Sequence, residues 1–298
     1  MKCPICEASV SRHLGARDGF QVVQCDRCGH VFVDPMPTPA ELDALYARYS
    51  YDSRDLETVP EFVASILAGV IASFAPYRRT GRFLDVGFGA GSLLRAAKAG
   101  GWEAHGIEFS RLAVEQARAN GFEHAIEGDF LKAPYAPGHF DVVAMDGVIE
   151  HLTNPAAFMR HAHLLLRPGG LLYITAPHGS GLSRRLLGAA WSVCAPPEHL
   201  HLFSRRSARR ALRAAGFTDL DLSTRGVNPY EILNHLRGRV RAPSAAHSFD
   251  RVESSYRLNG ALVGNPAGRL FKQAVNGALS ATGLGDQLVA RATKSAAT

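Results

Sequence analysis

The chain has 298 residues, of which 46% are hydrophobic, and a net charge of +6 from 33 basic and 27 acidic side chains. This length and composition predict a globular protein with one large domain and an appendage. The longest apolar segment, 62–74, is broken by Ser65, Gly69 and Ser73 and is too short to span a bilayer. Met1 leads straight into Cys3 rather than into a signal sequence, so we expect a cytoplasmic protein without a membrane span.

The first feature in chain order is a pair of Cys-x2-Cys motifs, formed by Cys3 with Cys6 and by Cys25 with Cys28. Four thiolates at this spacing can close tetrahedrally on one Zn²⁺, which predicts a structural rather than a catalytic zinc because no ligand position stays open. A segment this short buries too little apolar surface to fold alone, so zinc binding, on the order of 10 kcal/mol, would stabilise it. We predict a zinc ribbon over 1–35, then a linker and N-terminal helices over 36–79.

From Gly81 onward short apolar segments alternate with helical ones, which is typical of a parallel α/β sheet covered by helices on both faces. The predicted strands are Phe83–Val86, Ala104–Ile107, Ala125–Glu127, Phe140–Ala144 and Leu171–Thr175. The predicted helices include Leu93–Ala99, Arg111–Asn120 and Ala156–Leu166. This α/β core is expected to cover 80–225.

A glycine turn, Gly87-x-Gly89-x-Gly91, stands between the first strand and the first helix of this core, where a ligand can approach the backbone. Asp85 precedes the turn, and its carboxylate would repel a pyrophosphate but attract an ammonium group. A nicotinamide-dependent Rossmann enzyme is the alternative for such a turn.

The next two strands end in acidic residues. Glu108 closes the second strand, where its carboxylate can accept both hydroxyls of a ribose. Asp129 and Phe130 follow the third strand, as an acceptor for an exocyclic amine beside a ring. The ligand implied by these residues carries an amino acid, a ribose and an adenine, without phosphate.

These segments resemble those of class I S-adenosylmethionine-dependent methyltransferases. The resemblance rests on Leu84 to Gly91, Gly106 to Glu108, Phe140 to Val143, Val148 to Leu152 and Leu166 to Gly170. It implies a seven-stranded Rossmann-like sheet with a reversed last strand, for which Gln287–Ala292 is the candidate. The cofactor-binding set that it implies is Asp85, Gly87, Gly89, Gly91, Glu108, Asp129, Phe130 and Asp146.

Methyl transfer requires a base for the acceptor proton, and histidine suits neutral pH. His151 follows the fourth strand, His178 follows the fifth, and Glu198-His199 stands in the segment 197–204 together with His201. These histidines remain competing candidates from the residues alone.

The segment Glu198-His199-Leu200-x-x-Phe203-Ser204, together with the ribbon, is similar to zinc-bearing sugar C-methyltransferases of natural-product pathways. That resemblance assigns Glu198 and His199 to the acceptor proton and His151 to the pocket wall. The chain departs from that family at Pro197 and His201 and in lacking its long C-terminal half-domain. It also resembles O-methyltransferases of polysaccharide and secondary-metabolite pathways.

We therefore predict methyl transfer to a small hydroxylated or carbohydrate-like acceptor, with 226–298 as a helical substrate cap and final strand. Tyr46, Tyr49 and Tyr51 are a candidate lid over the cofactor. A methyltransferase that grips RNA or protein with its ribbon is the alternative, although a ribbon poor in Lys disfavours nucleic acid. A non-enzymatic binding module is a third hypothesis. Oligomeric state stays open.

Overall fold

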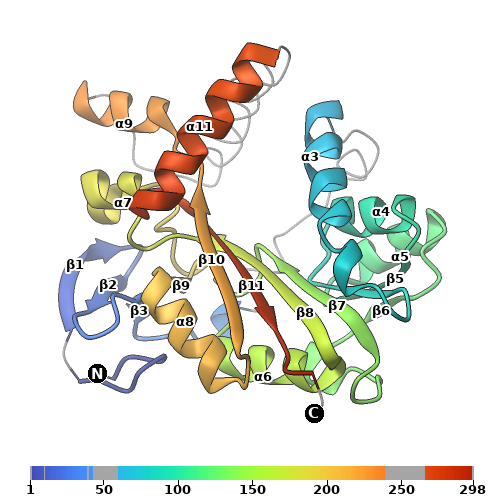
Figure 1. Ribbon diagram of the computed structural model, residues 1–298. Coiled ribbons are helices and arrows are strands. Elements are labelled where there is room, and N and C mark those ends of the chain that lie inside the picture. The colour runs from blue at the N-terminus through green and yellow to red at the C-terminus, as the bar shows by residue number, and fades with distance from the viewer. Residues whose placement is uncertain (1, 10, 39, 43–59, 239–265, 297–298) are drawn as a thin grey trace. The chain divides into compact units, whose positions relative to one another are not determined.

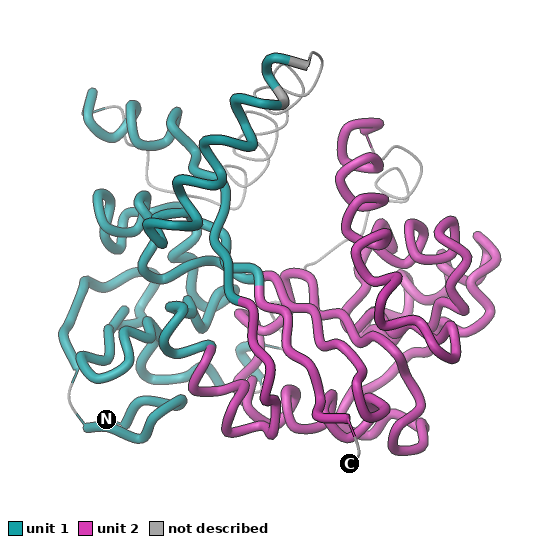
Figure 2. Tube along the Cα trace, viewed as in Figure 1, with its two compact units in different colours: residues 1–42, 176–208, 222–289 teal, residues 43–175, 209–221, 290–298 magenta. Residues whose placement is uncertain are grey.

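A computed structural model describes residues 2–9, 11–38, 40–42, 60–238 and 266–296 of the chain (Figure 1). The chain divides into two compact units (Figure 2). Unit 1 comprises residues 1–42, 176–208 and 222–289, and unit 2 comprises 43–175, 209–221 and 290–298. The predicted tyrosine lid, Tyr46, Tyr49 and Tyr51, lies outside the described residues.

Unit 2 contains the parallel strands that the alternating pattern predicts. They are β4 (Arg82–Val86), β5 (Glu103–Glu108), β6 (Ala125–Glu127) and β7 (Phe140–Asp146). Asp85 pairs with Gly106 and Gly106 with Ala125, so the carboxyl ends of β4, β5 and β6 lie at the same edge. Among the described residues, the α-helices that lie wholly in this unit are α3 (Glu61–Ala72), α4 (Ser92–Ala99), α5 (Arg111–Ala119) and α6 (Pro155–Leu165).

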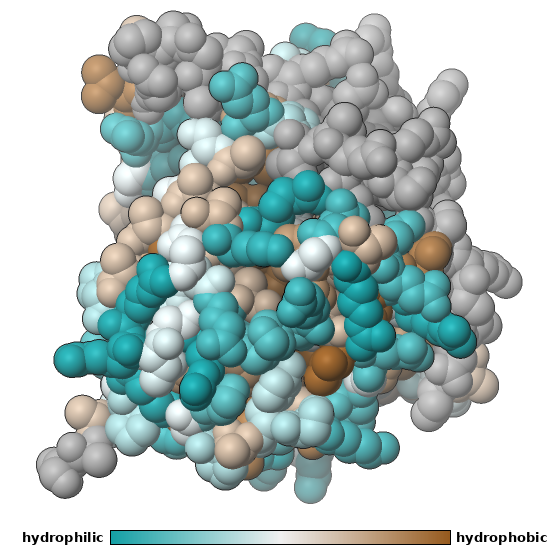
Figure 3. All heavy atoms as spheres, turned by 90° about the vertical axis from the view of Figure 1, so that its right-hand side faces the viewer, coloured by the Kyte–Doolittle hydropathy of each residue, from teal (hydrophilic) through white to brown (hydrophobic). Residues whose placement is uncertain are grey.

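The sequences of α4 and α5 contain local signals for helix packing and for helix initiation. Helix α4 buries Leu93, Leu94 and Ala97, spaced so that they share one face of the helix. Helix α5 begins at Ser110, whose side chain accepts a hydrogen bond from the Ala113 amide. On the face of the protein seen in Figure 3, hydrophilic residues are interspersed with apolar ones.

The complete sheet has seven strands in the order β10-β11-β8-β7-β4-β5-β6, with β8 at Leu166–Pro177, β10 at Asp219–Arg225 and β11 at Gln287–Thr293. The Lys294 amide donates to Gly170 near the start of β8, and the His178 amide donates to Asp286 just past the end of β8. Strand β11 therefore runs antiparallel to β8. This confirms the predicted reversed last strand, and α8 (Arg205–Ala214) precedes β10 in the chain.

Strand β8 begins earlier than predicted. The predicted strand started at Leu171, but the Gly169 amide donates to the Lys294 carbonyl, so the preceding segment also pairs as a strand. A partner distant in sequence satisfies the backbone there.

Unit 1 contains a four-stranded sheet in the order β1-β2-β3-β9, formed by Ser11–Arg17, Phe20–Cys25, Val31–Asp34 and His201–Leu202. Its helices are α7 (Leu182–Leu187), α9 (Pro229–Leu236) and α11 (Pro266–Thr282). Asn228 caps α9 by accepting from the Glu231 amide. Within the residues that the structure describes, no helix has the length and hydrophobicity needed to cross a bilayer.

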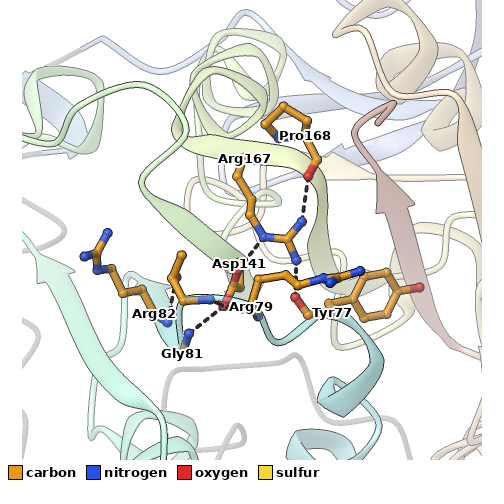
Figure 4. A network of polar contacts seen from close by, with 8 residues as sticks. Tyr77, Arg79, Gly81, Arg82, Asp141, Arg167 and Pro168 are labelled. Carbon is orange, nitrogen blue, oxygen red and sulfur yellow. Dashed lines mark hydrogen bonds and ion pairs between the residues drawn. The ribbon is translucent and has the colours of Figure 1, made fainter. Parts of the chain in front are cut away.

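A buried carboxylate at the start of β7 ties several segments of unit 2 together (Figure 4). Asp141 is fully buried, and one of its oxygens accepts from the amides of Arg79, Thr80 and Gly81 at 2.7–2.9 Å. The other oxygen accepts from Arg167 Nε. Burial alone would raise the pKa of Asp141, but the Arg167 guanidinium and the three amides lower it.

We expect Asp141→Asn to lower the free energy of unfolding by about 3–5 kcal/mol, because it leaves the Arg167 guanidinium without its buried counter-charge. The folded-state pKa of Asp141 is depressed, so its contribution is complete above the unfolded pKa and is lost as pH falls through the folded value. Urea unfolding would measure both effects, with the exposed Asp219→Asn as control. Equal stabilities of the two variants would contradict this prediction.

Candidate active site

The glycine turn after β4 has the backbone conformation that only glycine adopts readily. Gly87, Gly89 and Gly91 have φ values of 65°, 49° and 71°. A Cβ on Gly87 would lie 2.9 Å from a methyl group of Val148, so this position also excludes a side chain for lack of space. The turn is held to β5, because the Gly87 amide donates to the Ile107 carbonyl at 2.8 Å.

Glu108 ends β5 beside this turn. Its Oε2 accepts from the Gly89 amide at 3.0 Å and its Oε1 accepts from the Ser110 amide at 3.1 Å. The turn and β5 pack closely, since a Cβ on Gly106 would lie 2.6 Å from the Phe88 ring. The glycine turn thus fixes the Glu108 carboxylate at the carboxyl end of the sheet.

Asp85 lies nearby in β4 and is 2% exposed. Its Oδ2 has no hydrogen-bond partner among the described residues. Burial raises the pKa of Asp85 well above its usual range, and the negative charges of Asp146 and Glu108 raise it further. A buried carboxylate that lies among other carboxylates and has one oxygen without a partner fits a cationic ligand such as an ammonium group.

Two further predicted residues are held by local contacts. Asp146, at the end of β7, accepts a hydrogen bond from the Thr175 hydroxyl, a contact that the sequence interpretation missed. Asp129 accepts from the Leu131 amide at 2.9 Å and so caps the short helix Phe130–Lys132.

The Phe130 ring lies in the core. It is 2% exposed, and its ring centroid lies 5.4 Å from Phe158 and 4.9 Å from His161. Its neighbour Asp129 is less buried, so Asp129 is the more accessible of this predicted pair.

The candidate acceptor-side histidines differ in burial. In unit 1, His178 is 1% exposed and His201 is fully buried, whereas His199 and Glu198 are half-buried. His199 Nδ1 donates to the Val193 carbonyl at 2.8 Å, which places the lone pair of a neutral ring on Nε2. His151 belongs to unit 2, follows β7 and is also half-buried.

The four ribbon cysteines converge in unit 1. All are buried and reduced, with 3.6 Å between the sulfurs of Cys3 and Cys28 and 3.5 Å between those of Cys6 and Cys25. All four sulfurs lie within 4.8 Å of one another. A tetrahedral Zn²⁺ with bonds of about 2.3 Å requires sulfurs roughly 3.8 Å apart, so the cluster fits this ion.

Three features define an S-adenosylmethionine-dependent methyltransferase. They are a sheet of this strand order with one reversed strand, a glycine turn after β4, and the Glu108 carboxylate at the end of β5. Comparison with known families agrees, since a model described as a methyltransferase domain matches residues 59–222, more than half of the chain. The protein belongs to this family. The rival nicotinamide enzyme is thereby excluded.

Curated relatives of the chain are methyltransferases too. The chain is 29% identical over 170 residues to a ubiquinone biosynthesis O-methyltransferase of Ralstonia nicotianae, covering 53% of this chain and 69% of the relative. It is 31% identical over 100 residues to the protein of that name from Bordetella bronchiseptica, covering 32% of this chain and 42% of the relative. The chain thus spans less than half of the second relative's length.

Solved structures show the same fold. Phosphoethanolamine N-methyltransferase 2 of Haemonchus contortus in complex with S-adenosyl-L-methionine has a TM-score of 0.56 and 17% identity, covering 89% of this chain and 62% of that one. An S-adenosylmethionine-dependent methyltransferase from Archaeoglobus fulgidus has a TM-score of 0.50 and 14% identity, covering 86% of this chain and all of that one.

Proposed function

We propose that this methyltransferase acts on a hydroxyl-bearing small molecule, carbohydrate-like or a secondary metabolite, with His199 as the base for the acceptor proton. The observation that carries the proposal is the hydrogen bond from His199 Nδ1 to the Val193 carbonyl, which leaves Nε2 as the proton-accepting atom. Glu198, adjacent in the chain, would supply negative charge that favours the imidazolium. His151 is assigned to the pocket wall and is the rival base.

The cofactor would be held by residues at the carboxyl ends of β4, β5, β6 and β7. Asp85 would bind the ammonium of the methionyl group, Glu108 the ribose hydroxyls and Asp129 the adenine amine, while Asp146, Phe130 and the three glycines shape the site. When bound, S-adenosylmethionine supplies an activated methyl group, so the protein's main tasks are in-line positioning and proton removal. Because the named relatives are O-methyltransferases, an oxygen acceptor is favoured over a carbon one.

The insertion 226–285 would cap the acceptor and so determine its choice. Its described helices, α9 and α11, carry exposed apolar residues, among them Tyr230, Leu233, Leu270 and Phe271. Such residues suit an acceptor with an apolar part.

The proposal is tested by measuring S-adenosylhomocysteine release with a panel of phenols, catechols, sugars and nucleotide sugars, and with total RNA. Turnover of a small hydroxylated compound is expected. If methylation were found only on RNA, with an affinity that falls steeply with salt, the macromolecular alternative would replace this proposal.

We further propose one structural zinc per chain, held by Cys3, Cys6, Cys25 and Cys28. Cys25→Ser is expected to remove the metal and unfold the ribbon, because zinc binding supplies on the order of 10 kcal/mol to such small domains. Elemental analysis of reduced protein measures this. The matched control is Cys194→Ser, since Cys194 is equally buried but packs with Trp191 and Leu202 away from the other thiols. A metal-free wild-type protein would contradict the prediction.

A further inference from the structure

The second Cys-x2-Cys motif of the ribbon, Cys25 with Cys28, forms the second knuckle of the predicted zinc site. This knuckle contacts the segment 198–204, which carries the proposed base. Strand β3, three residues after Cys28, pairs antiparallel with β9, so that Val31 faces Leu202 and Phe32 faces His201. The Val33 amide extends this pairing by donating to the Leu200 carbonyl at 3.1 Å. The ribbon sheet therefore takes its fourth strand from the acceptor-side segment 198–204.

Side chains reinforce this backbone pairing at the knuckle itself. The Ser204 hydroxyl donates to the carbonyl of Cys28 at 2.8 Å, and Ser204 is 4% exposed. The knuckle turn is closed on the same side, since the Gly29 amide donates to the Cys25 carbonyl and the Cys25 amide donates to the His30 carbonyl. A zinc ligand residue is thus hydrogen-bonded directly to the end of the acceptor-side segment.

The side chain of His30 joins the second knuckle to the acceptor-side segment 198–204. It is fully buried, and its Nε2 lies 3.0 Å from Nδ1 of His201, which is also fully buried. The His30 ring also contacts Phe203, with 4.7 Å between ring centroids. His201 and Phe203 lie two and four residues after His199, so His30 fixes the strand that follows the proposed base.

We infer that the ribbon positions the acceptor-side segment 198–204 and that His30 is the positioning residue for His199, an inference that rests on the proposed function. The ribbon is then part of the acceptor site and not a separate module that binds RNA or protein. A zinc ion held by the four cysteines would affect catalysis only through geometry, because the cysteines organise the turn on which His30 and the Ser204 contact depend.

The first test compares His30→Ala with His30→Gln and with the control His13→Ala, an exposed ribbon histidine. We expect His30→Ala to keep one zinc and wild-type S-adenosylmethionine affinity but to lose up to about 10²-fold in kcat, the scale for a misplaced catalytic group. His30→Gln should recover part of this loss, since its amide can still hydrogen-bond, and His13→Ala should match wild type. Full turnover by zinc-loaded His30→Ala would overturn the inference.

The second test needs neither a variant nor a known acceptor. Hydrogen exchange is compared between zinc-loaded and zinc-stripped wild-type protein, and we expect faster exchange in 198–204 with unchanged protection in β4 and β5. Unchanged exchange in 198–204 would overturn the inference even if methyl transfer is observed. Conversely, wild-type protein that binds no S-adenosylmethionine would contradict the proposed function, while the exchange result would still decide the coupling.

Discussion

Glu108→Ala is expected to reduce S-adenosylmethionine affinity at least about 100-fold. The variant loses two charge-assisted hydrogen bonds from the ribose hydroxyls to the Glu108 carboxylate, each of roughly 1.5–3 kcal/mol. The structure adds a second cause. The Glu108 carboxylate accepts from the amides of Gly89 and Ser110, so its removal also takes away one of the contacts that hold the glycine turn to β5. Calorimetric titration with S-adenosylmethionine measures the loss, and Glu108→Gln should bind more tightly than Glu108→Ala because its amide oxygen still accepts.

Glu127→Ala is the matched control for this variant. Glu127 is directly paired with Glu108 at the end of the neighbouring strand β6, but its side chain is exposed. It should bind S-adenosylmethionine as the wild type does. Unchanged binding by Glu108→Ala, or binding of NAD by the wild type, would contradict the assignment of the cofactor site.

The parts of the fold that sequence predicts well are those set by local pattern. Alternating apolar segments located β4 to β7 within two residues at either end, because the buried strands of a parallel sheet are rich in apolar residues. The reversed β11 was predicted only through family resemblance, since the sequence of Gln287–Ala292 contains no signal for strand direction.

The parts that sequence missed depend on distant partners. The first residues of β8 were not predicted as strand because their partner, Lys294, is remote in the chain. The contact between His30 and His201 joins residues 171 positions apart, and no spacing rule connects them. Thr175 could have been anticipated as a residue at the carboxyl end of β8, although its hydrogen bond to Asp146 requires the strand register.

The candidate base illustrates the same limit. Sequence alone left several histidines in competition, because each follows a strand or lies near a carboxylate. Burial separates His178 from His199 and His151, which are both half-buried, since His178 is held by the Gly285 carbonyl at 2.8 Å and burial lowers its pKa to about 4. A ring so enclosed is poorly placed to take a proton from a small molecule, whereas His199 is half-buried.

His199→Ala is therefore expected to lose roughly 10²- to 10⁴-fold in turnover while binding S-adenosylmethionine normally, because a general base acts on the acceptor proton and not on the cofactor. Glu198→Gln should lose less, since the imidazole remains and the Val193 carbonyl still orients it. Turnover on the identified acceptor and calorimetric cofactor affinity measure the two effects separately. His151→Ala is the decisive comparison. If it abolished turnover while His199→Ala stayed active, the base would be His151, and the analogy with sugar C-methyltransferases would lose its main support.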